Sequence, residues 1–140
     1  MSDSRDHMIA ALREVVVPVL RDMSFRGSFP HFRRFRDTRT DLLTFQFNRY
    51  GGSFVVEVAY CSPDGITTSW DKHISPQEAQ THDVHPKYRL RLGSHPPQQS
   101  DYWFHYEPEH SDVYANTALE VLSLLRSDAE QFWHTDQPAT

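Results

Sequence analysis

The sequence predicts a two-layer α+β domain in which a mainly antiparallel sheet of about four to five strands is covered on one face by two helices. Segments with helical apolar spacing stand near the two ends of the chain, and short segments that alternate apolar and polar residues lie between them. Each alternating segment is apolar on one side only, so the sheet needs a cover on one face. The two amphipathic helices, N-terminal and C-terminal, can provide it. The predicted order is α-β-β-β-β-β-α.

Length and composition bound the class of protein. The chain has 140 residues, which suits a single domain over residues 1–140, with an ordered core over about residues 5–134 and a frayed tail at 135–140. Hydrophobic residues make up 38% of the chain and aromatic residues 13%, enough for a core that needs no disulfide or metal. Cys61 is the only cysteine, and we find no signal-peptide pattern and no run of about 18 apolar residues. We therefore expect a soluble cytoplasmic protein.

The first predicted helix occupies the N-terminal part of the chain. Its apolar face is formed at helical spacing by Ile9, Leu12, Val16, Leu20 and Met23. Ser4 is of a residue type that caps helix N-termini, so we predict it as the N-cap. Pro18 lacks a backbone donor and should kink or divide this helix.

Three strand signals follow the first helix. They are the segments HFRRFR (31–36), DLLTFQFNR (41–49) and SFVVEVAYC (53–61). In the second of them Leu43, Phe45 and Phe47 alternate with polar residues. Gly51 and Gly52 tolerate the positive φ angles of a tight turn, so the second and third strands should form a hairpin.

The second half of the chain supplies two shorter strands and a helix. Residues 62–86 are polar and rich in turn-forming residues, with a short helical turn predicted within SPQEAQ (75–80). The predicted fourth and fifth strands are KYRLRLG (87–93) and the aromatic DYWFHYE (101–107). The last predicted element is a helix from about Asp112 to Trp133, whose apolar stripe is Tyr114, Ala118, Val121, Leu122, Leu125, Ala129 and Phe132.

The stretch THDVHP, residues 81–86, raises the question of a metal site. His82 and His85 could be two ligands of a catalytic zinc site, with Asp83 or His73 as the third, because zinc uses His and carboxylate side chains in such sites. The His-x-x-His spacing is weakly specific in a chain with 9 histidines, so we favour a polar loop that leads into the fourth strand. Cys61 has no neighbouring motif that would activate a thiol, and no phosphate loop or nucleophile elbow occurs. We therefore predict no catalytic residue, metal or cofactor.

Charge is unevenly distributed along the chain. The segment from Arg26 to Arg39 holds five arginines and one aspartate, whereas residues 101–140 hold eight carboxylates and one arginine. The basic segment also carries aromatic residues, so it could bind nucleic acid through phosphate contacts and base stacking. Against this interpretation, the net charge is −5 and the isoelectric point about 5.9. Charged residues that protect a sheet edge explain the same segment.

The residues that we single out as candidates for a binding surface are arginines and one tryptophan. Both residue types are enriched among the residues that dominate interface energetics. The candidates are Arg33, Arg34, Arg36, Arg89, Arg91 and Trp103, and the nucleic-acid alternative adds Arg39. If alternation holds in the fifth strand, Tyr102, Phe104 and Tyr106 face one way and Trp103 and His105 the other.

Several of these segments together resemble a known family. The stretch from Val19 to Tyr60, followed by RLRLG (89–93) and DYWF (101–104), is similar to the bacterial family called domain of unknown function 4304. The resemblance rests on Ser24-Phe25 after the first helix, Phe45-Gln46-Phe47 in a strand, Arg91-Leu92-Gly93 and Tyr102-Trp103, and it spans about residues 8–133. Ser24 departs from the glycine that the resemblance implies there. No activity, cofactor or catalytic residue comes with the resemblance.

We expect the chain to act as a non-catalytic protein-binding module, for example an immunity-like or accessory protein, which is monomeric or homodimeric. An acidic surface would suit a basic partner, because complementary charge raises association rates. One alternative is a small metal-dependent hydrolase that uses the Thr81–Pro86 loop, and another is a nucleic-acid binder that uses the Arg26–Arg39 segment. We expect another protein as the partner, with nucleic acid less favoured and no membrane contact.

Overall fold

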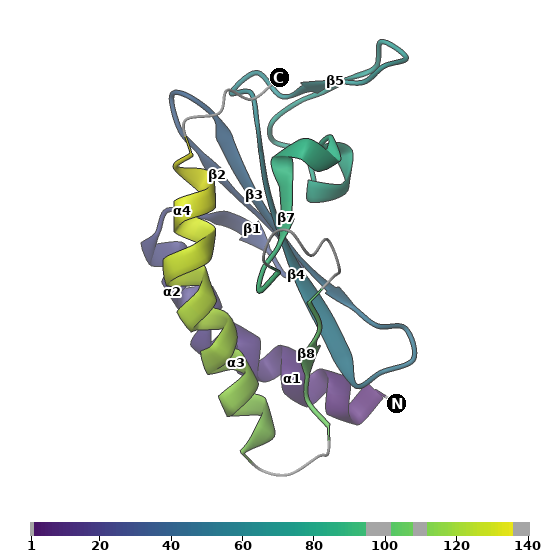
Figure 1. The fold of residues 1–140 in the computed structure, drawn as a ribbon, viewed down its shortest axis with the longest axis vertical. Coiled ribbons are helices and arrows are strands. Elements are labelled where there is room, and N and C mark those ends of the chain that lie inside the picture. Colours follow the sequence, from purple (N-terminus) through teal and green to yellow (C-terminus); the bar gives the residue numbers. More distant parts are fainter. Residues whose placement is uncertain (1, 95–101, 108–111, 136–140) are drawn as a thin grey trace.

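The computed structural model describes residues 2–94, 102–107 and 112–135, and it confirms the predicted α+β architecture (Figure 1). A six-stranded antiparallel sheet has the strand order β1-β2-β3-β4-β7, and β8 also pairs with β4. The N-terminal and C-terminal helices pack side by side across one face of this sheet. Residues 136–140, most of the tail predicted to fray, lie outside the described residues. No helix within the described part of the chain is both long and apolar enough to span a membrane.

The first helix is divided at Pro18, as predicted. One residue, Val16, separates helix α1 (Ser2–Val15) from α2 (Val17–Asp22), and Pro18 lies in the first turn of α2. The prediction of Ser4 as the N-cap is wrong, because α1 begins at Ser2 and Ser4 is a buried residue inside it. Ser24 has φ 76° and follows α2 in a left-handed conformation, with Ser24 N–H bonded to Arg21 O and Phe25 N–H bonded to Leu20 O. This is the turn for which glycine is preferred.

Strands β3 (Thr40–Phe47) and β4 (Ser53–Cys61) form the centre of the sheet. Their predicted hairpin is confirmed, with Gly51 at φ 91° and Gly52 at φ 83°. Leu43, Phe45 and Phe47 of β3 lie opposite Val58, Val56 and Phe54 of β4, so the predicted apolar face turns to the helices. Strand β4 is buried on both faces, which the alternating pattern does not predict.

The other strands are short and flank this hairpin. Strand β2 (His31–Phe35) pairs with β3 and with β1 (Arg26–Ser28), a three-residue strand that is not among the predicted ones. On the far side of β4 lie β7 (Arg89–Arg91) and β8 (Phe104–His105), both shorter than predicted.

Residues 62–86, predicted to be a turn-rich polar segment, contain ordered elements. A separate two-stranded hairpin consists of β5 (Ile66–Thr67) and β6 (His73–Ile74). Two 3-10 turns follow, η1 (Thr81–Asp83) and η2 (Pro86–Tyr88). The buried side chains of Ala79 and Val84 belong to the same core cluster as Leu42 and Ala59, which lie on the face of the sheet opposite the helices. The segment from Ala79 onward therefore covers part of that second face.

The C-terminal helix contains a π-helical turn. It runs as α3 (Val113–Leu124), the π-turn η3 (Leu125–Ala129) and α4 (Glu130–Trp133). A π-turn adds a residue and rotates the following side chains relative to a regular α-helix. The apolar stripe accordingly ends on Trp133, which is fully buried, whereas the predicted Phe132 is only half-buried and packs against Tyr60.

Candidate binding surface

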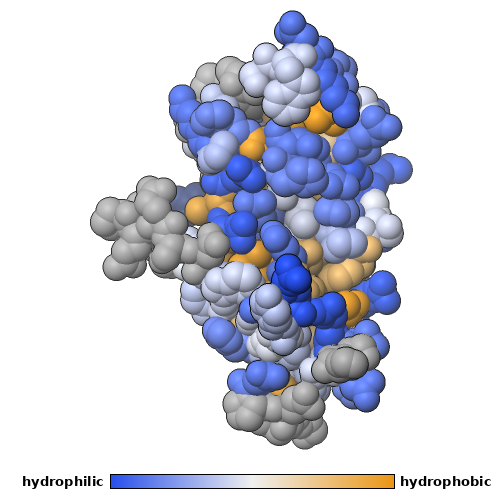
Figure 2. Space-filling model, turned by 90° about the vertical axis from the view of Figure 1, so that its right-hand side faces the viewer, coloured by the Kyte–Doolittle hydropathy of each residue, from blue (hydrophilic) through white to orange (hydrophobic). Residues whose placement is uncertain are grey.

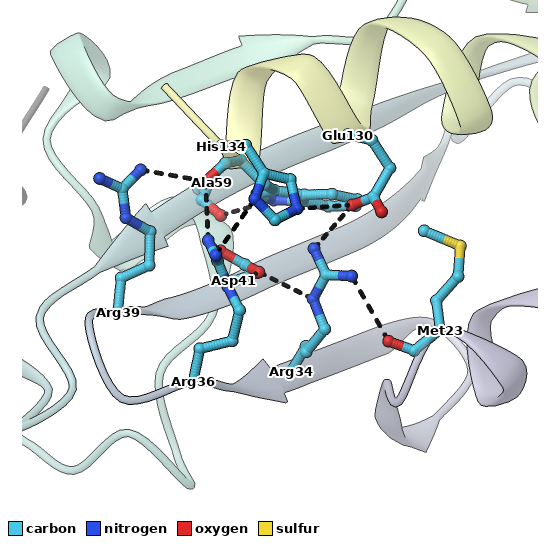
Figure 3. A network of polar contacts seen from close by, with 9 residues as sticks. Met23, Arg34, Arg36, Arg39, Asp41, Ala59, Glu130 and His134 are labelled. Atoms are coloured by element: carbon cyan, nitrogen blue, oxygen red, sulfur yellow. Dashed lines mark hydrogen bonds and ion pairs between the residues drawn. The ribbon is translucent and has the colours of Figure 1, made fainter. Parts of the chain in front are cut away.

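Two arginines of the basic segment lie around the carboxylate of Asp41 (Figure 3). Alternation along β2 places Arg34 on the helix-facing side of the sheet, opposite Asp41 in the strand register. Asp41 Oδ2 accepts hydrogen bonds from Nε of Arg34 and Nε of Arg36, both at 2.8 Å, and Oδ1 accepts one from Nη2 of Arg36 at 2.9 Å. Arg34 also donates from Nη2 to Oε1 of Glu130 at 2.7 Å. We call Arg34, Arg36, Asp41 and Glu130 the Asp41 cluster.

The Asp41 cluster is an interior ion-pair network. The Asp41 side chain is 0% exposed, and a carboxylate in such a position is stable only when it is paired. Burial alone would lower the pKa of Arg34, but its hydrogen bonds and charge interactions with Glu130 and Asp41 outweigh this effect and raise that pKa. Arg34 therefore remains charged, and the network joins β2 and β3 to the C-terminal helix.

The end of that helix is capped by arginines. The carbonyl oxygen of Trp133 accepts hydrogen bonds from Nη2 of Arg36 at 2.7 Å and from Nη1 of Arg39 at 3.1 Å. The last carbonyls of a helix have no partner within the helix, and cationic side chains are favoured there. Arg34 and Arg39 are buried, so the placement of Arg34 on a binding surface needs correction.

Arg89 and Arg91 lie together on the second face of the sheet. The register aligns Arg91 with Glu57 and then with Thr44 and His31 in one row across four strands. Glu57 Oε2 is 3.1 Å from Nε of Arg91 and 3.9 Å from Nη1 of Arg89. Arg89 and Arg91 therefore both form ion pairs with the Glu57 carboxylate, and Glu57 is buried.

Arg33 also points to the second face, but two strands, β3 and β4, separate it from β7. Its Nε donates to the carbonyl oxygen of Ala79 at 2.7 Å, which fastens the segment after β6 to the sheet. Burial lowers the pKa of Arg33 and that of neighbouring His31. Because Arg33 and Arg34 face opposite sides of β2, the basic segment forms no continuous patch.

The THDVHP stretch contains the turn η1 and the start of η2. Asp83 Oδ2 accepts the backbone N–H of Gln80 at 3.0 Å, and Nδ1 of His85 accepts the N–H of Lys87 at 3.1 Å. His82 is 67% exposed and lies 3.3 Å from Oδ1 of Asp83. Across the described residues, no three His, Cys, Asp or Glu side chains are grouped so that they could hold a metal ion. Asp83 and His85 serve as caps of short turns.

The fifth predicted strand has the expected alternation in its second half. Phe104 and Tyr106 are buried beside Phe54, whereas His105 is exposed. Trp103 is half-buried, and Tyr102 donates a hydrogen bond to the Glu120 carboxylate of the C-terminal helix. Trp103 is therefore less accessible than the exposed tryptophan of the β5–β6 hairpin.

That tryptophan is Trp70, which sequence analysis missed. It is 73% exposed and lies in the turn between β5 and β6. The turn is ordered by backbone hydrogen bonds from Thr68 N–H to Lys72 O at 2.8 Å and from Asp71 N–H to Thr68 O at 3.0 Å, with Asp71 at φ 64°. Figure 1 shows this hairpin projecting from the upper end of the molecule.

The hairpin is attached firmly at its base. Ile66 is buried in the main core, and Ser62 and Gly65 form an isolated bridge where the chain leaves β4. A side chain at Gly65 would meet Ile74 O at 2.1 Å, so the base of the hairpin is tightly packed. Two-residue strands show no alternation, and the only available signal was an apolar residue on each side of the polar TTSWDKH stretch (67–73).

Comparison with family models gives the chain its place among known proteins. Residues 5–135 match the family described as Domain of unknown function (DUF4304). The chain belongs to this family. The DUF4304 match covers nearly the whole chain and confirms the resemblance seen in the sequence. No curated protein and no solved structure matches the chain.

The thiol of Cys61 in this DUF4304 chain should be unreactive. Cys61 is buried at the end of β4, and burial, followed by the nearby carboxylates of Asp41 and Asp83, raises its pKa to about 12 from an ordinary 9.0. A thiol in this state stays protonated at neutral pH, and the thiolate is the nucleophile. We expect iodoacetamide at pH 8 to leave the folded protein unmodified and to alkylate it in denaturant.

The raised pKa of Cys61 also makes the stability of the protein depend on pH. The unfolded thiol ionises at lower pH than the folded one, so its contribution to stability is complete below about pH 9 and is lost as pH rises toward about 12. Alkylation of the folded protein at the rate of the unfolded protein would contradict the buried, protonated state.

Proposed function

We propose that this chain is a non-catalytic protein-binding module that contacts its partner through Trp70. Tryptophan side chains on ordered turns are typical anchors of protein interfaces, because they bury a large apolar area while losing little conformational freedom. Trp70 makes no aromatic, cation–π or hydrogen-bond contact with another described residue, and it is 73% exposed. Binding to a pocket on another protein would remove this apolar surface from water.

A comparison with another exposed aromatic residue favours Trp70. Tyr50 is 86% exposed on the β3–β4 turn, at the opposite end of β4. Its ring lies 5.2 Å from the guanidinium carbon of Arg49, so it already has a partner within the chain. Tyr50 is therefore the natural control for an experiment on Trp70.

The side toward which the hairpin projects is mainly hydrophilic. Figure 2 shows this side, on which hydrophobic residues form small, separate areas. Large apolar interfaces are typical of obligate complexes, whereas polar surfaces with a few anchors are typical of regulated or transient ones. We therefore propose a complex with a different protein, in the cytoplasm, rather than a permanent homodimer.

The nucleic-acid alternative receives less support. Of the five arginines between Arg26 and Arg39, only Arg26 is exposed, while Arg34 and Arg39 are buried and the other two are half-buried. Arg33, Arg34, Arg36 and Arg39 each donate hydrogen bonds to protein acceptors. Guanidinium groups held in this way are poorly placed to contact phosphates.

Trp70→Ala is expected to abolish capture of the partner while leaving stability unchanged to within about 0.5 kcal/mol. The tagged full chain, the Trp70→Ala variant and the control Tyr50→Ala would each be incubated with a lysate of the source organism. Bound proteins would then be quantified by mass spectrometry. We expect a protein that is retained by wild type and Tyr50→Ala and lost with Trp70→Ala. Identical retention by all three proteins would overturn the role of Trp70.

A further inference from the structure

We infer, on the basis of the function proposed above, that the partner is a folded protein with a basic rim around an apolar pocket. The inference rests on the charges at the end of the sheet that carries the hairpin. The β2–β3 turn and the β5–β6 hairpin both lie at this upper end in Figure 1. The sequence of the turn region is basic, but its arginines face inward.

The inward arginines are balanced within the protein. Arg34 and Arg36 are paired with Asp41, Arg34 is also paired with Glu130, and Arg39 donates to the helix end at Trp133. Three guanidinium groups and two carboxylates leave a formal excess of +1, which is held in buried or half-buried groups bonded to protein oxygens. This charge is therefore poorly available to a partner.

Three exposed carboxylates lie at this end of the sheet. Asp37 lies in the β2–β3 turn, Asp64 precedes β5, and Asp71 is next to Trp70. No ion pair joins any of the three to another described side chain. Lys72 is the exposed lysine of the hairpin, and these three carboxylates and one ammonium group together carry a charge of −2. We call Asp37, Asp64 and Asp71 the acidic rim.

A second exposed apolar residue lies at the same end of the sheet. Phe35 is 45% exposed at the end of β2, and the register runs from Phe35 to Thr40 and on to Cys61, the last residue of β4. The hairpin leaves the sheet directly after Cys61, across the Ser62–Gly65 bridge. Phe35 at the end of β2 and Trp70 on the hairpin are therefore both exposed at the end of the molecule that carries the exposed carboxylates. An exposed aromatic side chain on a surface with carboxylates suits an apolar pocket edged by Lys or Arg.

A basic protein fits this surface better than a membrane does. The chain carries a net charge of −5, and anionic headgroups would be repelled by the acidic rim. Complementary charge between two proteins raises the association rate and makes it depend on salt.

The test removes the charges of the acidic rim without changing the shapes of the side chains. The variant Asp37→Asn/Asp64→Asn/Asp71→Asn is compared with Asp3→Asn/Asp6→Asn/Asp22→Asn, which alters net charge equally at exposed positions on the N-terminal helices. Thermal unfolding would first confirm that both variants fold. The protein captured in a Trp70-dependent manner would then be purified, and its association rate with each variant measured at about 0.15 M and about 1 M salt.

We expect a captured protein of high isoelectric point, whose association rate falls about tenfold with the rim variant at about 0.15 M salt and is unchanged with the control variant. At about 1 M salt the difference should disappear. A Trp70-dependent partner that is acidic, or that is insensitive to the rim, would overturn the inference but leave the proposed function standing. Absence of any Trp70-dependent partner would overturn both. Trp70-dependent flotation of the protein with vesicles of phosphatidylglycerol and phosphatidylethanolamine would identify a membrane as the binding partner. That result would overturn the inference and the proposed function.

Discussion

Replacement of Asp41 by alanine is expected to lower the free energy of unfolding by about 3–5 kcal/mol. The Asp41 carboxylate is fully buried. Among the described residues it is the only ion-pair partner of Arg36 and one of two for Arg34. Without it, two guanidinium groups remain in a poorly hydrated site, with Glu130 as the remaining carboxylate. Urea unfolding followed by circular dichroism would measure the change.

The matched control is Asp37→Ala, four residues earlier in the chain and exposed. Substitutions at such positions usually change stability by less than about 0.5 kcal/mol. If Asp41→Ala were as mild as Asp37→Ala, the Asp41 cluster would not be the internal tie between the sheet and the C-terminal helix that its geometry indicates.

Trp133→Ala is expected to destabilise the protein by about 3–5 kcal/mol. Trp133 is 0% exposed, its ring centroid lies 4.9 Å from that of Phe25, and its Nε1 donates to Ala59 O at 3.0 Å. Truncation would leave a cavity between α4 and the sheet and would leave one buried carbonyl without this donor. The same denaturant titration would report the loss as a lower midpoint.

Trp70→Ala provides an internal comparison, because it is the same substitution at an exposed site. Its expected effect on stability is within about 0.5 kcal/mol. The pair therefore separates a tryptophan that holds the fold from one that is available to a partner. Equal destabilisation by the two substitutions would contradict the assignment of Trp70 to the surface.

The central part of the fold could be predicted because local pattern and tertiary structure agree there. Alternation in DLLTFQFNR and SFVVEVAYC and the glycine pair between them define β3, β4 and their turn. Pro18 marks the break between α1 and α2 for a local reason, the missing backbone donor. The π-turn in the C-terminal helix has no comparable local signal, so the apolar stripe could not be predicted to end on Trp133.

The candidate surface was harder to predict because it depends on distant partners. Arg34 follows another arginine in the mixed segment HFRRFR, which has no pattern that would mark it as buried. Its burial depends on Asp41 in the next strand and on Glu130, 96 positions later. Arginines of the basic Arg26–Arg39 segment therefore form an interior ion-pair network, whereas the carboxylates of the acidic rim are exposed at the same end of the sheet. The hairpin that displays Trp70 has strands of only two residues, which are too short to show a period.

Photo-cross-linking from position 70 in living cells tests the central claim most directly. A photoreactive phenylalanine analogue would replace Trp70 in one sample and Tyr50 in another, and cross-linked proteins would be identified by mass spectrometry. We expect one protein to be cross-linked from position 70 and not from position 50. The same weak, mixed products from both positions would contradict a binding role for the β5–β6 hairpin.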